Sequence, residues 1–308
     1  MKSSHLSRGR AELLLAGVLM ARSTSYLFSK LILTGMGVFN LLAFRFGLAF
    51  VLLAVLFFPR LRKLDRKTLL SGGVMGLLFF CVMTAELNGV KRTASGTASF
   101  LVNTAIVLVP LLQALWMRRL PRRKAILSAL LCFAGVACLT LASGVRFGAG
   151  ERWCLLAALI YACTILVTDR LSHSGIDTLA AGIVQVGVIA ALSLGASLLF
   201  EAPRLPSGSL EWTGIAMLAL VCTGFGFTLQ PVAQSGTTAE RAGMFCALNP
   251  MVATTLGAVV LHEPFTLRTV LGGLLILSGI VLSELPEEKG KPSRVMRKQG
   301  TAPVHKNA

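Results

Sequence analysis

The amino-acid sequence predicts an all-α polytopic membrane protein with ten transmembrane helices, arranged as two inverted repeats of five helices. The chain of 308 residues has a mean hydropathy of +0.75, and only 14% of its residues are charged, against about 25% in soluble domains. Apolar runs of about 20 residues recur along it, which is the length that crosses a hydrocarbon core of about 30 Å. The second half also repeats landmarks of the first at an offset of 140 residues.

Four landmarks share this one offset. They are Lys30 with Arg170, Arg45 with Gln185, Ser95-Gly96-Thr97 with Ser235-Gly236-Thr237, and Pro110 with Pro250. A repeat of this length is too large for a solenoid unit and indicates a duplicated bundle. In an apolar chain, such a duplication is typical of a membrane transporter built from two halves.

Ten apolar spans follow one another with short connections, which leave no room for a separate soluble domain. We assign residues 11–145 to the first repeat and residues 150–285 to the second, with a cytoplasmic leader at 1–10 and a disordered, basic cytoplasmic tail at 286–308. The predicted spans are Ala11–Leu33, Val38–Phe58, Thr68–Val90, Ser95–Met117, Ala125–Ala142, Trp153–Leu171, Leu179–Phe200, Leu210–Leu229, Arg241–Leu261 and Leu267–Leu285.

Particular residues justify individual spans in chain order. Arg22 and Lys30 interrupt the first run and no small-residue cleavage site follows, so we expect a retained helix and not a signal peptide. Basic clusters bound the second, third, fourth and fifth spans on one side of the membrane. The third span holds a GxxxG pair at Gly72 and Gly76, which predicts close helix packing. The sixth span mirrors the first, and the remaining four follow in the order of the repeat.

The distribution of positive charge predicts that the two repeats face opposite ways. Five spans per half is an odd number, so two directly joined halves enter the membrane from opposite sides. The loop between spans two and three carries five Lys or Arg residues, and its repeat partner between spans seven and eight carries one. Because Lys and Arg in short loops stay cytoplasmic, this places both termini in the cytoplasm and the protein in the cell membrane.

Several classes of protein are disfavoured by the placement of the polar residues. The net charge of +17 lies at span ends and in the tail, which indicates topology signals and not a nucleic-acid groove. The seven cysteines lack a CxxC pair and lie in or beside apolar spans, so we expect neither disulfides, nor a metal site, nor a cofactor. The four His are scattered outside the spans, and no Walker loop is present, which disfavours an enzyme and direct use of ATP.

Five stretches in a fixed order carry a family resemblance. They are Phe39–Phe46 in the second span, Lys91–Ala98 leading into the fourth, Ala247–Ala253 in the ninth, and then His262-Glu263-Pro264 and Leu271–Gly279. Over residues 11–285 the chain resembles the EamA-like branch of the drug/metabolite transporter superfamily. The resemblance implies ten helices in inverted five-helix repeats, and transport or export of a small metabolite.

Charged residues inside the spans are the first candidates for a transport site, because each costs about 2.5–3.5 kcal/mol on insertion scales. Arg22, Tyr26 and Lys30 share one face of the first helix. Arg22 is interpreted either as a cavity cation that meets an anionic or zwitterionic substrate, or as a structural clamp, whereas snorkelling is favoured for Lys30. Arg45 and Glu86 are candidates for proton coupling or for a structural ion pair.

Uncharged polar residues form a second set of candidates. They either orient a ligand or bond helix to helix, and they are Asn103, Thr104 and Asn249 in spans four and nine, with Tyr161, Thr164 and Thr168 on one face of span six. Pro110 and Pro250 lie at equivalent depths and are expected to kink helices four and nine.

Taken together, the sequence predicts a secondary transporter, interpreted as an exporter, of a small metabolite such as an amino acid or organic anion. Access would alternate around a central cavity between the repeats, lined by spans one, three, four, six, eight and nine. The partners expected are the small-molecule substrate and the lipid bilayer, and no nucleic acid. Proton coupling and a homodimer stay open, and the alternatives to a transporter are a membrane-embedded enzyme and a channel.

Overall fold

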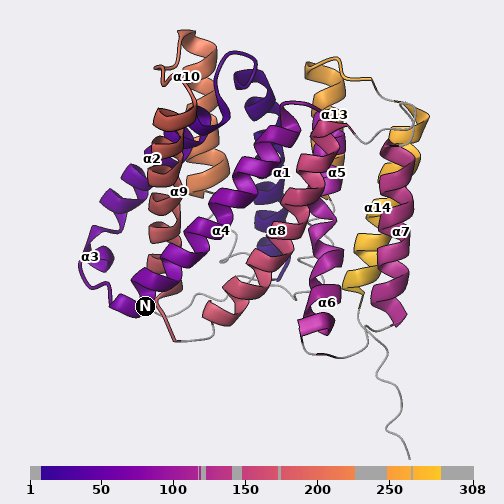
Figure 1. Cartoon of the computed structure of the whole chain (residues 1–308), viewed down its shortest axis with the longest axis horizontal. Coiled ribbons are helices and arrows are strands. Elements are labelled where there is room, and N and C mark those ends of the chain that lie inside the picture. The colour runs from indigo at the N-terminus through magenta and orange to yellow at the C-terminus, as the bar shows by residue number, and fades with distance from the viewer. Residues whose placement is uncertain are drawn as a thin grey trace, which may run out of the picture.

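The computed structural model describes residues 8–116, 118, 123–140, 148–172, 175–225, 248–264 and 266–285. The predicted tail at 286–308 and most of the predicted leader therefore lie outside the described residues. Every regular element in the described part is a helix (Figure 1). The first half contains α1 Arg8–Ile32, α2 Val38–Leu56, α3 Phe58–Leu61, α4 Arg66–Val90, α5 Ser95–Asn103, α6 Ala105–Trp116 and α7 Arg123–Thr140. The second half contains α8 Ala149–Ser172, α9 Thr178–Phe200, α10 Gly208–Ala216, η2 Met217–Phe225, α13 Leu248–Val260 and α14 Leu267–Glu284.

Each predicted span coincides with one helix or with two consecutive helical segments, and the differences are local. The fourth span is divided into α5 and α6 at Thr104, and the eighth changes from α-helix to the wider π-helix η2 at Met217. Residues 241–247, where the ninth span was predicted to begin, lie outside the described part. Five helical stretches are long and apolar enough to cross a bilayer by length and composition: Val38–Leu56, Arg66–Val90, Ser95–Trp116, Ala149–Thr168 and Thr178–Phe200. The chain is therefore an all-α, multi-pass membrane protein.

Side-chain caps define where several helices begin. The Asp65 carboxylate accepts from Thr68 N, and Asp177 accepts from Leu179 N and Ala180 N at 3.1 Å each. Such caps satisfy backbone donors that have no partner in the first turn of a helix. They fix the residues at which α4 and α9 begin.

Helix α9 lies against both α2 and α4, and the approach to α4 is close. A Cβ atom built on Gly72 would lie 2.7 Å from Ala181 O, and one on Gly76 would lie 3.0 Å from Gln185 O. The GxxxG pair thus allows backbone-to-backbone contact between helices of different halves, as the sequence predicted. The α7–α14 pair is similarly close, since a Cβ on Gly135 would lie 2.6 Å from Gly272 O. This pair lies on one side of the bundle, and α2, α3, α9 and α10 lie on the other (Figure 1).

Helices α2 and α9 run in opposite directions. The start of α2 meets the end of α9, where Glu201 accepts from Phe39 N at 3.1 Å and Asn40 N at 2.9 Å. Near the far end of α2, Arg60 Nε lies 3.6 Å from Asp177 Oδ2, which caps the start of α9. Helices α2 and α9 are therefore antiparallel neighbours.

Candidate functional site

Helix α1 is the element around which the candidate residues gather, since it packs against α4, α5, α10, η2 and α13. Its middle carries three consecutive hydroxyls, and two of them reach helices of the second half. Ser23 Oγ donates to Asn249 Oδ1 of α13 at 2.7 Å, and Thr24 Oγ1 lies 3.6 Å from Cys222 Sγ of η2. Asn249, a predicted site residue, is thereby joined to the first repeat across the centre of the bundle.

Arg45 is buried where α2 faces α1 and η2. Its Nε donates to Thr223 Oγ1 at 3.0 Å, and its Nη1 donates to Ser25 Oγ at 3.0 Å. The guanidinium also lies 5.3 Å from the centre of the Phe46 ring. These contacts with α1 and η2 fit a structural role for Arg45, while a coupling role stays a prediction.

Lys30 belongs to a network at one end of the bundle, which we call the Lys30 end. Its Nζ donates to Thr93 O and lies 3.0 Å from Glu263 Oε1, with 25% of the lysine and 13% of the glutamate side chain exposed. Glu263 also accepts from Ser95 N at 2.9 Å and from Ser95 Oγ at 3.0 Å, which caps α5. Lys30 is thus held by protein partners instead of extending alone toward the headgroups.

Thr93 extends this network to α8, because its Oγ1 donates to Glu151 Oε1 at 2.8 Å. Helix α8 therefore starts at the Lys30 end and carries Arg170 to the opposite end, which we call the Arg170 end. There the Arg170 guanidinium lies 5.5 Å from the centre of the Trp116 ring, at the end of α6. Lys30 and Arg170, the landmarks of the repeat, thus occupy opposite ends of the bundle.

Tyr26 lies one turn before Lys30 on α1 and is buried beside Glu86, Ser99 and Cys154. Glu86, the candidate for coupling or for an ion pair, thus lies beside this tyrosine. Arg22 falls within α1 one turn earlier, but its side chain is not among those described. A proton-coupling role for Glu86 and substrate recognition by Arg22 therefore stay predictions.

Helix α5 ends in a break at which two candidate residues bond to their own helix. Asn103 Nδ2 donates to Ser99 O at 2.7 Å, and Thr104 Oγ1 donates to Leu101 O at 2.6 Å. The break lies at Thr104, and Pro110 follows inside α6. Pro250 is the third residue of α13, and the turn before it, where a bend was expected, lies outside the described residues.

The predicted face of α8 turns toward α4 and α6. Tyr161 meets Phe79 edge-on, with ring centres 6.0 Å apart, and it packs beside buried Ala158 and Ala162. Thr164 Oγ1 donates to Ile160 O of its own helix at 2.8 Å, and Thr168 is half-buried. The candidates therefore divide into an α1 group and an α8 group, on the two helices that the repeat relates.

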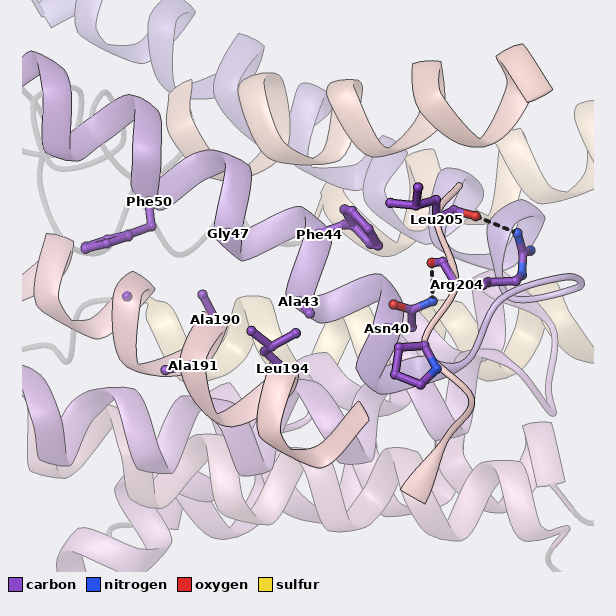
Figure 2. A pocket seen from close by; sticks show the side chains of 12 residues that line it. Asn40, Ala43, Phe44, Gly47, Phe50, Ala190, Ala191, Leu194, Arg204 and Leu205 are labelled. Atoms are coloured by element: carbon purple, nitrogen blue, oxygen red, sulfur yellow. Dashed lines mark hydrogen bonds between the residues drawn. The ribbon is translucent and has the colours of Figure 1, made fainter. Parts of the chain in front are cut away.

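Two apolar cavities lie between helices in the described part. One of about 450 Å³ lies between α2, α9 and the segment that follows α9 (Figure 2), and one of about 540 Å³ lies between α4, α8 and α9. None of the predicted site residues lines either of them. Among the described residues, no group of three His, Cys, Asp or Glu could hold a metal ion.

Sequence reasoning missed the acidic partners that close the Lys30 end. Glu263 was noted only as part of a motif, and Glu201 and Glu211 were not singled out. Glu211 forms two contacts with the Arg204 guanidinium, at 2.5 and 2.9 Å, and Arg204 Nε donates to Gly35 O at 3.0 Å. The one feature of the sequence that could have indicated these acids is their location, since each lies at or within two residues of the end of a predicted apolar span.

Comparisons with known proteins place the chain in a family and show which proteins it is similar to. The model of the EamA-like transporter family matches residues 9–141 and again 148–285. The uncharacterized transporter YetK of Bacillus subtilis (strain 168) is 26% identical over 294 residues, covering 89% of this chain and 87% of the relative. An uncharacterized transporter of Archaeoglobus fulgidus is 29% identical over 77% of this chain and 85% of its own length. A crystal structure of a protein 21% identical in sequence superposes with a TM-score of 0.64 over 90% of this chain and 97% of that chain.

Proposed function

Because the chain belongs to the EamA-like transporter family, we propose that this membrane transporter moves a small metabolite by alternating access between two inverted five-helix repeats. The observation that carries the proposal is the antiparallel contact between equivalent helices. Helices α2 and α9 run in opposite directions, and α5 begins beside the end of α13, where Glu263 caps it. Equivalent helices that meet head to tail are what two oppositely oriented copies require.

The packing scheme supports the same symmetry. In the repeat, α1 corresponds to α8, and the α5–α6 pair corresponds to the span that contains α13. The contact of α1 with α13 therefore has its counterpart in the contacts of α8 with α5 and α6. Likewise, α4 corresponds to the span that contains η2, so the contact of α4 with α8 has its counterpart in the contact of η2 with α1. Helices α7 and α14 correspond to each other, and they pack together. A bundle whose contacts survive this exchange can adopt two related states, which is the requirement of rocking-type alternating access.

The two ends of the bundle differ in how firmly they are held, and this supports an outward-closed state. With both termini in the cytoplasm, the Lys30 end is the outer one, and the Lys30–Glu263 pair with its Ser95 and Thr93 contacts closes it. At the inner end, the exposed Arg170 and Trp116 meet through a cation–π contact, and Arg60 Nε lies 3.6 Å from Asp177 Oδ2 with both side chains largely exposed. Exposed contacts of these two kinds are each worth about 0–1 kcal/mol. The inner end would therefore open first from this state.

The substrate class we propose is an amino acid or an organic anion. Intramembrane cations occur in the first repeat at Arg22, Lys30 and Arg45, and the last two are held by Glu263 and by hydroxyls. Arg22 is then the residue we assign to a substrate carboxylate. The adjacent Ser23–Asn249 contact brings the second repeat to the same level of α1. Export is a further part of the proposal, while proton coupling through Glu86 and a homodimer stay open.

Flux into proteoliposomes tests the proposed function. Purified protein is reconstituted and loaded with unlabelled amino acids or organic acids, and uptake of labelled solute is followed with and without a pH gradient. Saturable counterflow for a member of these classes, absent from protein-free liposomes, is the expected result. Failure of every member to exchange would contradict the proposal, and conductance without saturation would indicate a channel instead.

A further inference from the structure

The groove between α2 and α9 is an apolar site that none of the predicted site residues lines. Small residues leave it open along its length, and Phe44, Phe50 and Leu194 form its sides (Figure 2). A Cβ on Gly47 would meet nothing within 4 Å, so the space beside this glycine is unfilled. The Phe50 ring packs onto Gly187, where a Cβ would lie 2.7 Å from it.

The groove opens on the surface that faces lipid. Both of its helices are long and apolar enough to cross a bilayer. Its edges continue into exposed apolar side chains, among them Leu48 and Val51 of α2 and Leu194 and Leu198 of α9. Exposed apolar surface of this extent on membrane-spanning helices is covered by hydrocarbon.

One end of the groove is polar, and its charge is balanced. Asn40 Nδ2 donates to Arg204 O at 2.8 Å (Figure 2). The Arg204 guanidinium is paired with Glu211. Trp212 stands beside this end and meets Phe44 edge-on, with ring centres 6.2 Å apart. Tryptophan beside balanced polar groups is typical of the boundary between hydrocarbon and headgroups.

These features select one kind of occupant. A helix of a second copy is about 10–12 Å wide, too wide to enter a groove whose floor is two helices in contact. Water finds few partners among the apolar side chains, and an empty groove would forfeit dispersion contacts along its walls. We propose that the groove binds one acyl chain of a bilayer phospholipid, with the headgroup beside Asn40 and Arg204, so that the lipid bridges α2 of the first repeat and α9 of the second.

Filling the groove tests this site without reference to transport. Gly47→Leu places a side chain in the open space, and Gly73→Leu is the matched control, because a Cβ there also meets nothing within 4 Å but lies on α4. The full chain is extracted in detergent and washed extensively, and phospholipid per protein is measured by mass spectrometry. Wild type and Gly73→Leu are expected to retain a phospholipid, and Gly47→Leu is expected to lose most of it.

Fluorescence of Trp212 reports on the same site. In a background with Trp116→Phe and Trp153→Phe, brominated-chain phosphatidylcholine carried through the washes should quench Trp212, and Gly47→Leu should abolish this residual quenching. Ala190→Leu, which also fills the groove, keeps the test decisive if Gly47→Leu does not fold. Equal retention and equal quenching in groove-filled and control variants would show bulk lipid only and overturn the proposal.

Discussion

Lys30 Nζ lies 3.0 Å from Glu263 Oε1, and this ion pair joins α1 of the first repeat to the residues that follow α13 in the second. The same carboxylate accepts from the backbone and the hydroxyl of Ser95 and so holds the start of α5. One acidic side chain therefore connects three segments at one end of the bundle. Any motion that separates the repeats at this end must break the pair.

Glu263→Gln should loosen the Lys30 end. The amide keeps the shape of the carboxylate but leaves Lys30 without an opposite charge, and losing a charged hydrogen bond costs about 1.5–3 kcal/mol. The thermal midpoint in detergent should fall, and maleimide labelling of a cysteine at Thr97, in a cysteine-free background, should accelerate. Glu201→Gln is the control, since Glu201 caps α2 through two backbone N–H groups. Equal labelling in both variants would refute a special role for the Lys30 pair.

Trp116→Leu should act at the opposite end and more weakly. It removes the ring that Arg170 covers at 5.5 Å, and both residues are exposed. Labelling of a cysteine at Thr168 should rise slightly, while labelling at Thr97 should stay constant or fall. An increase at Thr97 as large as that of Glu263→Gln would contradict the assignment of the two contacts to opposite ends.

Arg45→Lys should destabilise the protein although it keeps the charge. A lysine ammonium lacks the planar fork with which Arg45 reaches both Ser25 and Thr223. We expect a loss of about 1–3 kcal/mol, seen as a lower thermal midpoint. In proteins that already carry Ser25→Ala, Thr223→Val or both, the further loss caused by Arg45→Lys should be smaller, which a mutant cycle measures. Unchanged stability with a shifted pH profile of flux would favour a coupling role for Arg45 instead.

Glycines on one stretch of α4 should respond differently to the same substitution. Gly72→Ala and Gly76→Ala place a Cβ against α9 and should destabilise by about 1–3 kcal/mol through overpacking. Gly73→Ala meets open space and should be neutral or stabilising by up to about 1 kcal/mol. Thermal unfolding in detergent measures all three, and similar losses at the three positions would contradict the packing described.

Arg22→Gln should raise the KM for a carboxylate substrate by about 10-fold to 100-fold, the equivalent of one charged hydrogen bond of about 1.5–3 kcal/mol. The effect should be smaller for an analogue whose carboxylate is amidated. Arg22→Lys should restore part of the affinity. Counterflow in proteoliposomes at matched protein content measures these constants, and an unchanged KM with lower thermal stability would indicate that Arg22 is a clamp.

Hydropathy and loop charge were sufficient to predict the helices and their order. Most helix starts and ends in the described part lie close to the ends of the apolar runs, because burial in lipid depends on local composition. The break at Thr104 and the π-helix from Met217 were not predictable from these runs. They depend on how neighbouring helices satisfy or displace backbone hydrogen bonds, which local composition does not encode.

The sequence by itself determined that the chain is a helical membrane protein, that its halves are repeats, and which polar residues lie inside apolar spans. Only the tertiary structure decided the partners of those residues: Glu263 for Lys30, Ser25 and Thr223 for Arg45, and Asn249 for Ser23. It also decided where small residues leave an unfilled groove. The physical reason is that insertion into lipid depends on each segment separately, whereas an ion pair or a cavity requires side chains from distant segments to meet at distances of a few ångströms.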